Sequence, residues 1–407
     1  MMKMGAERRR ATTRVAPTTG LSRPIFVPMK SDPVRLQSVE FASVVVTPWT
    51  EWTFARLRAE RGAFADVEMT ADGDVFRLVT EMVGSLKGIN IREEVDVSGL
   101  LGVDERRLSG DLATATAMSA LRTGVSIIQA VEDGSTLTER LGGEKRGRVS
   151  LYANINRGLF ATSRTPDDFA KAAERAVGEG FRAVKCAPFD EVSPGDDSDE
   201  AVRKARFGIQ RVTAVRDAMG PDVTLMVDCH GRFDVESAVA VAEEMAELGV
   251  DWFEEPVRPN EEPVDSARIA ARVSMTVAGG EMGYGEEVFA DLIEEEAVEV
   301  IMPDVMFCGG AAVAVRSGRE ANVNGGGVSL HSPSGPVSLL TGGHVTASIP
   351  GAMALEHAVH EADWRADLLT PAERVEDGCL HLPSAAGLGA ALDWEFLRRV
   401  GWVWGHS

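Results

Sequence analysis

Cysteine is scarce in this chain of 407 residues: the four that occur are widely spaced and form no CxxC pair. This usage argues against a disulfide framework and favours a reducing compartment. No apolar run approaches the roughly 20 residues that a membrane-spanning helix needs. We therefore expect a cytoplasmic protein that does not span a membrane.

Basic residues are also in deficit, with 42 Lys and Arg against 63 Asp and Glu, which gives a formal net charge of -21. A charge of this sign argues against a nucleic-acid partner and against an anionic membrane surface. It would also repel an anionic substrate unless local cations offset it.

Residues 1–33 are rich in Arg, Thr and Pro and lack the apolar core of a secretory signal. An amphipathic organellar presequence is one alternative for this segment. We favour a disordered tail or an upstream translation start.

The pattern between Val34 and Gly143 is irregular. It predicts a strand at Phe41–Val46 and a helix at Gly110–Val131, where apolar residues recur near helical spacing. Between them we expect a loop that holds aromatic and basic residues: Trp49, Trp52, Phe54, Arg56 and Arg58.

After Gly143, short apolar runs alternate with amphipathic helices, which is typical of βα units on a parallel sheet. In one unit, Thr165 is expected to cap a helix that begins at Pro166 and ends near Gly180. Eight units fit within about 210 residues, so the sequence predicts a (β/α)8 barrel. The candidate strands end near Asn154, Ala187, Asp228, Glu254, Glu281, Asp304, His331 and Glu356.

Six of these candidate strands end on an ionisable residue, although strand interiors are normally apolar. A single Asp after an apolar run is more often a helix cap or a turn residue. The carboxyl ends of barrel strands meet at one mouth, where active sites form. Six ionisable ends on successive units therefore predict a functional site.

Three of these residues are suited to hold one metal ion: Asp228, Glu254 and Glu281 on adjacent strands. With no His or Cys among them, the oxygen ligands favour Mg2+ over zinc. The alternative for Glu254 or Glu255 is a structural ion pair with a barrel lysine. We assign Glu254 to the metal and leave the ion pair to Glu255.

Several stretches, in this order and spacing, resemble the mandelate racemase branch of the enolase superfamily. They are AVKCA (183–187), MVDCHGR (226–232), DWFEEPV (251–257), AGGE (278–281), PD (303–304), HSPSGP (331–336) and GLG (387–389). The resemblance implies an α/β fold, a modified TIM (β/α) barrel with an α+β N-terminal capping domain completed by the C-terminal segment. We place the cap at 34–145, the barrel at 146–357 and the C-terminal segment at 358–407. Members of this family are commonly homo-oligomers, and we expect one here.

The resemblance also implies roles for the other strand-end residues. His331 and Asp304 match a His–Asp dyad, in which the carboxylate orients the imidazole. Glu356 matches an acid that hydrogen-bonds the substrate carboxylate. Racemase-like members carry Lys-x-Lys on the second strand, whereas this chain has Lys185-Cys186-Ala187 and lacks the second lysine.

His230 is a candidate for the missing base. It lies two residues after Asp228, so on an extended strand both side chains face the same way. The Asp-Cys-His-Gly-Arg run resembles galactonate and mannonate dehydratases; a turn or core histidine is the alternative. Lys185 is expected either to contact the substrate carboxylate and tune a neighbouring pKa, or to form a structural ion pair.

These residues predict an Mg2+-dependent enzyme that removes the proton alpha to a carboxylate of a small-molecule acid. The favoured reaction is dehydration of an aldonate to a 2-keto-3-deoxy acid by His230 and His331. A racemase, an epimerase and a cycloisomerase are the alternatives within the enzyme class, and a catalytically silent, ligand-binding barrel is the alternative outside it. Specificity is expected to depend on the cap loop at about 47–66, through Trp49, Trp52 and Arg56.

Overall fold

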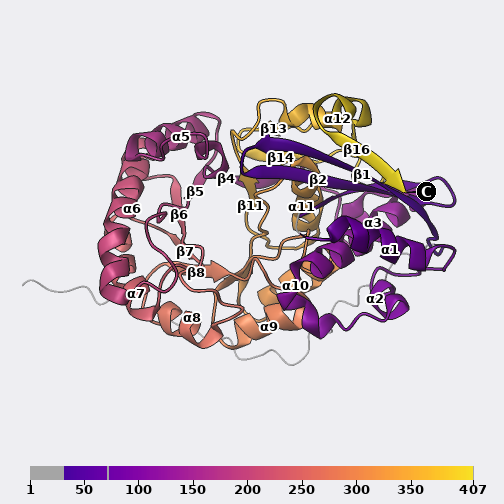
Figure 1. Ribbon diagram of the computed structural model, residues 1–407. Coiled ribbons are helices and arrows are strands. Elements are labelled where there is room, and N and C mark those ends of the chain that lie inside the picture. Colours follow the sequence, from indigo (N-terminus) through magenta and orange to yellow (C-terminus); the bar gives the residue numbers. More distant parts are fainter. Residues whose placement is uncertain (1–31, 71–72, 407) are drawn as a thin grey trace, which may run out of the picture.

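The computed structural model describes residues 32–70 and 73–406, so the predicted N-terminal tail lies almost entirely outside the described residues. Within them, eight parallel strands form a ring (Figure 1). Strands β4 to β10 pair side by side in sequence order, and β11 pairs with β4. Met353 N donates to Val328 O at 2.9 Å between β10 and β11, which closes the barrel. The strands are β4 (Arg148–Asn154), β5 (Ala183–Cys186), β6 (Thr224–Asp228), β7 (Trp252–Glu254), β8 (Thr276–Gly279), β9 (Val300–Ile301), β10 (Gly327–Val328) and β11 (Leu355–Ala358).

Seven α-helices follow the first seven strands and surround the barrel in Figure 1. The last strand, β11, leads instead into a 3-10 helix, η3 (Arg365–Leu368). The barrel is therefore a modified (β/α)7β barrel, with one helix fewer than eight complete units would give. The helices are α5 (Pro166–Gly178), α6 (Ser198–Met219), α7 (Val235–Glu247), α8 (Pro263–Ala270), α9 (Glu286–Glu294), α10 (Ala311–Val323) and α11 (Pro336–Ser348).

Helix α5 has the ends that the sequence predicts. The Thr165 hydroxyl accepts from Asp168 N, and the Asp168 carboxylate accepts from Thr165 N, which completes a capping box. Gly180, just beyond the helix, has a φ of +94°, a conformation that glycine adopts without strain.

The barrel interior is layered because strand side chains alternate between its two faces. Met226 and Trp252 belong to a small apolar cluster inside the ring, and two residues further along their strands come Asp228 and Glu254. Asp228 and Glu254 are register partners on β6 and β7. The acidic layer thus lies directly on an apolar floor, at the carboxyl ends of the strands.

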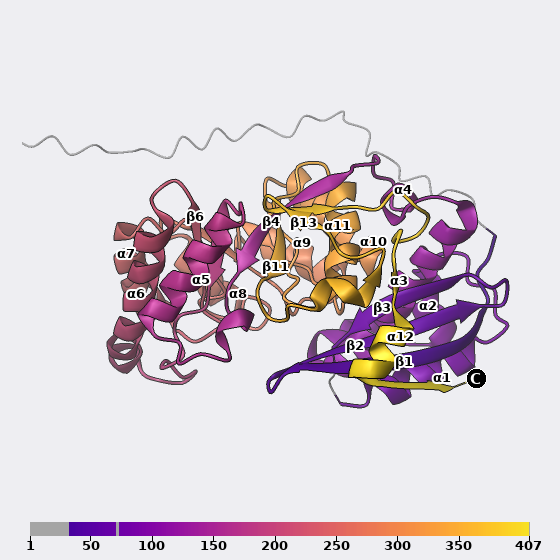
Figure 2. The ribbon, with the colours of Figure 1, turned by 90° about the horizontal axis from the view of Figure 1, so that it is seen from above.

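The cap consists of an antiparallel sheet and helices beside the barrel (Figure 2). Its strands are β1 (Leu36–Thr47), β2 (Thr50–Ala59) and β3 (Phe64–Met69), and its helices are α1 (Val75–Leu86), α2 (Asp96–Leu101), η1 (Glu105–Gly110), α3 (Leu112–Asp133) and α4 (Leu137–Arg140). Helix α3 agrees with the helix predicted at Gly110–Val131. The loop expected after Val46 is instead a hairpin of β1 and β2 that turns at Pro48 and Trp49. Arg58 pairs with Glu40 across this hairpin, and Arg56 pairs with Asp66 between β2 and β3.

The C-terminal segment runs from the barrel to the cap. Near the barrel, β13 (Val375–Glu376) pairs with β14 (Cys379–His381), which pairs antiparallel with β4. Strand β12 (Leu369–Thr370) pairs with β15 (Ala391–Leu392), and α12 (Trp394–Val400) follows. The last strand, β16 (Trp402–His406), pairs with β1 and so adds a fourth strand to the cap sheet. Among the described residues, no helix combines the length and apolar character that crossing a membrane requires.

Candidate active site

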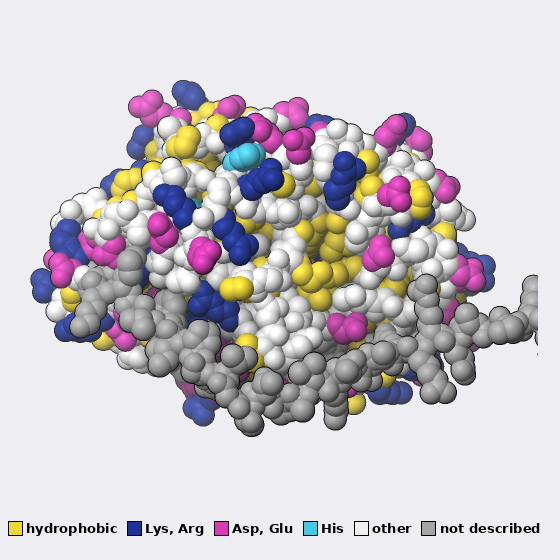
Figure 3. Space-filling model, turned by 180° about the vertical axis from the view of Figure 1, so that it is seen from behind, with side chains coloured by type: hydrophobic (Ala, Val, Ile, Leu, Met, Phe, Trp, Pro, Cys, Tyr) yellow, Lys and Arg dark blue, Asp and Glu magenta, His cyan; other side chains and the backbone are white. Residues whose placement is uncertain are grey.

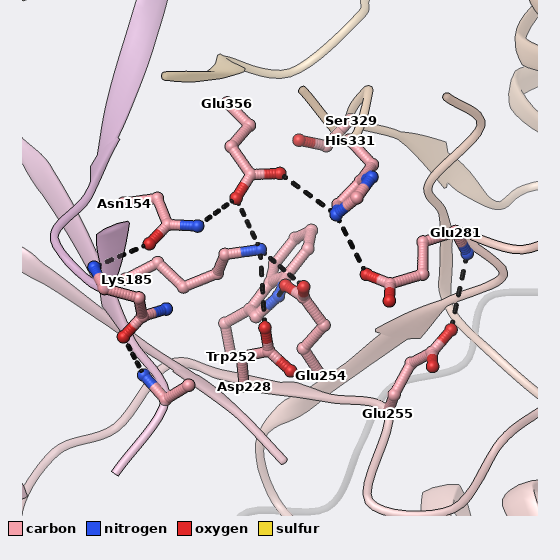
Figure 4. A network of polar contacts seen from close by, with 12 residues as sticks. Asn154, Lys185, Asp228, Trp252, Glu254, Glu255, Glu281, Ser329, His331 and Glu356 are labelled. Carbon is pink, nitrogen blue, oxygen red and sulfur yellow. Dashed lines mark hydrogen bonds and ion pairs between the residues drawn. The ribbon is translucent and has the colours of Figure 1, made fainter. Parts of the chain in front are cut away.

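The strand-end residues predicted from the sequence converge at one mouth of the barrel (Figure 4). Asp228 and Glu254 end their strands, whereas Glu281, Asp304 and His331 lie two or three residues beyond theirs, on the loops that follow. Glu356 lies within β11. The loops, rather than the strands, therefore position the side chains of Glu281, Asp304 and His331.

Lys185 lies at the centre of the acidic layer and is completely buried. Its Nζ is 2.5 Å from Glu254 Oε1, 2.9 Å from Glu356 Oε1 and 3.9 Å from Asp228 Oδ2. Burial alone would lower the pKa of Lys185, but Glu254 and Glu356 raise it well above its usual value, so the ammonium stays charged. The structure thus places Lys185 in an ion-pair network, one of the two roles expected for it.

Glu356 is buried and saturated by donors. Its Oε1 accepts from Asn154 Nδ2 at 2.6 Å as well as from Lys185, and its Oε2 accepts from Ser332 N at 3.0 Å. Although burial favours the neutral acid, Lys185 and His331 hold the pKa of Glu356 below its usual value. Glu356 therefore accepts hydrogen bonds from three neighbours, and its contact with a substrate carboxylate stays a prediction.

His331 and Asp304 form the expected pair. The imidazole Nδ1 lies 2.8 Å from Asp304 Oδ2, which leaves Nε2 directed at Glu281 Oε2, 3.1 Å away. Burial lowers the pKa of His331, but Glu281, Glu356 and Asp304 together raise it to about 10. Asp304 itself is fixed by Met306 N, which donates to its other oxygen at 2.8 Å.

His230 contacts Asp228, as the sequence predicted, but through a different backbone conformation. The strand ends at Asp228, and His230 has a φ of +52°, so the chain turns there instead of remaining extended. The turn directs the imidazole Nε2 to within 2.9 Å of Asp228 Oδ2, while His230 N donates to Oδ1 at 3.0 Å. Asp228 raises the pKa of His230 to about 9.

A pocket of about 710 Å³ opens above these side chains. Asp228, His230, Glu281 and His331 line it, and so does Ala187, at the position where racemase-like members carry a lysine. Lys185, Glu254, Asp304 and Glu356 lie beneath and do not line the pocket. Of the predicted site residues, two histidines and two carboxylates are therefore accessible from the pocket.

The three cap residues expected to bind substrate have different surroundings. Trp49, at the hairpin tip, is 67% exposed, lines the pocket and packs edge-on against Phe160. Trp52 is buried; it stacks with Arg365 at 5.1 Å and lines an adjoining pocket of about 460 Å³. Arg56 lines neither pocket, because Asp66 binds it through two hydrogen bonds of 2.7 Å, which corrects the expected substrate contact.

Sequence analysis missed several residues that line the pocket, among them Asn156, Arg157, Phe160 and Arg232. Asn154 ends β4, and this polar strand end is a signal of the same kind as Asp228. Asn156 fixes the loop after β4, because its Oδ1 accepts from Ala187 N at 2.6 Å. Arg157 lies near Thr50 of the cap, 3.4 Å from its hydroxyl.

The donor set suits Mg2+ by kind, because all three residues supply carboxylate oxygens. Asp228, Glu254 and Glu281 come from three successive strands, and Glu281 Oε2 is buried without a hydrogen-bond donor of suitable geometry. Burial and the nearby carboxylates of Asp228 and Glu356 raise the pKa of Glu254 to about 8, although Lys185 lowers it. The acidic layer thus holds more carboxylates than cations. Among residues 32–70 and 73–406, no group of three or more His, Cys, Asp or Glu side chains has a metal-binding arrangement; Asp228 lies near His230, Glu254 near Lys185 and Glu281 near His331.

Residues 168–396 match the family model described as "Enolase C-terminal domain-like", which is more than half of the chain. A D-gluconate dehydratase of Thermoproteus tenax is 30% identical over 293 residues, which cover 72% of this chain but only 57% of that protein. A D-xylonate dehydratase of Haloferax volcanii is 26% identical over 353 residues, covering 84% of this chain and 83% of that protein.

Among solved structures, the chain resembles a member of the enolase superfamily from Salmonella Typhimurium. The TM-score is 0.79 at 21% sequence identity, with 92% of this chain and 100% of that chain covered. The likeness therefore extends through the cap as well as the barrel.

Proposed function

This chain belongs to the enolase superfamily, and from that premise we propose that it is an acid-sugar dehydratase. It removes the proton alpha to the substrate carboxylate and eliminates a beta hydroxyl as water. The enol so formed then tautomerises to a 2-keto-3-deoxy acid. The gluconate and xylonate dehydratases among its relatives support this reaction class.

One observation carries the proposal: His230 and His331 line the same pocket, and Ala187 stands where a lysine base would be. With a lysine absent from that face, two histidines are available for proton transfer. One takes the alpha proton and the other donates a proton to the departing hydroxyl. The Asp304 contact keeps the His331 proton on Nδ1 and leaves Nε2 free to act as base or, once protonated, as acid.

Asp228, Glu254 and Glu281 are the residues that would hold Mg2+. When bound, the ion supplies positive charge that stabilises the anion developing on the substrate carboxylate as the alpha proton leaves.

The buried layer beneath the pocket prepares the site electrostatically. Lys185 holds Glu254 and Glu356 in fixed positions, and Trp252 Nε1 donates to Glu254 Oε2 at 2.9 Å. Because buried partners already hold these groups, their charges are preorganised and act with little reorganisation cost.

The pocket wall suits a polyhydroxylated acid. Arg157 and Arg232 line it with Asn154 and Asn156, and together they offer donors and acceptors for sugar hydroxyls. Trp49 covers one side with an apolar ring. In a chain of net charge -21, these arginines also supply local cations for an anionic substrate.

A screen of aldonates and related acid sugars with Mg2+, monitored for 2-keto acid formation, tests the function. We expect turnover of at least one acid, loss of activity after exhaustive chelation, and recovery when Mg2+ is added. Full turnover after chelation would contradict the metal assignment. Failure of every acid sugar to give keto acid would contradict the dehydratase proposal.

A further inference from the structure

The loop between β10 and α11 carries His331 and is held at three points by charged side chains. Ser332 N donates to Glu356 Oε2 at 3.0 Å, from the barrel. Arg365 Nη1, from the C-terminal segment, donates to Ser334 O at 2.7 Å. The third point is Gly335 N, which donates to Glu68 Oε1 at 2.5 Å.

Glu68 belongs to the cap, on β3, far from this loop in sequence. Its second oxygen accepts from Ser338 N at 2.9 Å, and its side chain is buried. Helix α11 has Gly335 at its N-cap position, which offers no side chain to satisfy the free N–H groups of the first turn. The cap carboxylate therefore caps a barrel helix across the domain interface, where the helix dipole favours negative charge.

Gly335 makes this approach possible. Its φ is -75°, which any residue tolerates, so backbone conformation does not demand glycine there. A Cβ at this position would lie 2.6 Å from Glu68 Oε1. The Glu68 carboxylate therefore occupies the space that a side chain at position 335 would need.

We propose that Glu68 is a positioning residue, through which the cap fixes the His331 loop and sets the orientation of its imidazole. This inference rests on the proposed function, because that function assigns His331 to proton transfer. Glu68 touches no reacting atom; it lines the adjoining pocket with Pro333 and Ser334. The cap then influences proton transfer by His331 as well as substrate binding.

The first test needs no substrate. Hydrogen–deuterium exchange of the whole protein should show faster uptake in the segment 329–340 of Glu68→Gln than in the wild type, because an amide cannot accept from both N–H groups. Asp66→Asn is the matched control: Asp66 is a buried carboxylate on the same strand, but it binds Arg56 and Leu392 N. Uptake in this segment that is unchanged in Glu68→Gln, or raised equally by both variants, would overturn the proposal.

The second test is kinetic, with an accepted acid sugar. A loop displaced by about 1 Å costs on the order of 10²-fold in rate, so kcat of Glu68→Gln should fall by that order while KM changes little. A loss of kcat no larger than that of Asp66→Asn would contradict the positioning role. If the wild type turns over no acid sugar, the proposed function fails, and the exchange measurement alone decides whether Glu68 holds the loop.

The pH dependence separates this role from simple loss of packing. Burial raises the pKa of Glu68 to about 7, and the charged groups that face it are Arg365, which lowers the pKa, and Asp304, which raises it. Protonation makes Glu68 resemble glutamine. The kcat ratio of wild type to Glu68→Gln should therefore shrink towards one as the pH falls from about 8 to about 6, either side of that pKa. A constant ratio would argue against the role.

Gly335→Ala tests the same contact from the other side and serves if Glu68→Gln does not fold. The added methyl group should displace the Glu68 carboxylate and lower kcat. In a Glu68→Ala background the clash is gone, so Gly335→Ala should lower kcat no further. Equal losses in both backgrounds would show that Gly335 and Glu68 act independently.

Discussion

At the scale of single residues, the site is governed by an excess of buried negative charge. Lys185 is the only lysine in contact with the acidic layer among the described residues, and it faces Glu254, Glu356 and Asp228 at once. His230 pairs with Asp228, and His331 pairs with Glu281 and Asp304. Each proton on a histidine is therefore stabilised by a specific neighbour, and removing that neighbour should change what the histidine can do.

Asp304 is predicted to act only through His331, whose Nδ1 it contacts at 2.8 Å. Asp304→Asn would change the tautomer and basicity of the imidazole, and His331→Asn would remove it. Each single variant should lose about 10²–10⁴-fold in kcat/KM, the range typical of general acid or base catalysis. The double variant should lose no more than the worse single variant. Losses that multiply fully in the double variant would show that the two residues are not a dyad.

The identities of these residues and the His331–Asp304 pair could be predicted from the sequence, but the other contacts could not. An ionisable residue at the end of an apolar run predicted Asp228, Glu254 and Glu356 in one layer. The sequence left the ion pair with a barrel lysine to Glu255, but Lys185 pairs with Glu254 and Glu255 accepts from Gly280 N, because such a pairing depends on side-chain reach across the barrel. Arg56 was assigned to substrate because its partner, Asp66, becomes a neighbour only through the register of the β2–β3 hairpin.

At the scale of elements, the loops rather than the strands position several side chains of the site. Strands β9 and β10 are two residues long in the structure, and Asp304 and His331 lie on the loops beyond them. The sequence pattern predicted the order and spacing of the βα units, since it depends on alternating apolar periodicity. It did not predict the hairpin at Pro48 and Trp49, because this turn lacks the Asn-Gly or Asp-Gly pair typical of tight hairpins.

Helix α11 contains one buried histidine, His344, which makes the stability of the folded protein depend on pH. His344 Nδ1 lies 2.8 Å from the Thr138 hydroxyl and Nε2 lies 3.2 Å from Leu388 O, a pairing that suits the neutral ring. Burial lowers the pKa of His344 from 6.5 to about 4. Between these values the unfolded chain binds a proton that the folded chain does not, so stability falls as the pH falls.

The expected loss from this one group is roughly 3 kcal/mol across the window from pH 6.5 to about 4. Urea unfolding at several pH values should give a shallower acid loss of unfolding free energy in His344→Gln than in the wild type. His381→Gln, which changes a partly exposed histidine, serves as the control. An identical pH slope in wild type and His344→Gln would show that His344 does not titrate in this way.

At the scale of the whole molecule, the cap and the barrel are joined by the C-terminal segment. Strand β16 completes the cap sheet, β14 extends the barrel sheet, and Arg365, which precedes both in the sequence, binds the His331 loop. On the face seen in Figure 3, basic and acidic side chains are interspersed around a hollow that exposes hydrophobic side chains. A homo-oligomer stays a prediction, which light scattering of the purified protein would test.

The central claim is that two histidines, His230 and His331, divide the removal of the alpha proton and the loss of the beta hydroxyl. Single His→Asn variants, followed by proton NMR in deuterium oxide with an accepted acid sugar, test it most directly. The account predicts that one variant loses exchange of the alpha proton with solvent. The other keeps that exchange, through reprotonation by the remaining base, but releases no keto acid. Each loss should be about 10²–10⁴-fold. Near-normal turnover by His230→Asn would contradict the account, and an alpha-inverted product without keto acid would favour a racemase instead.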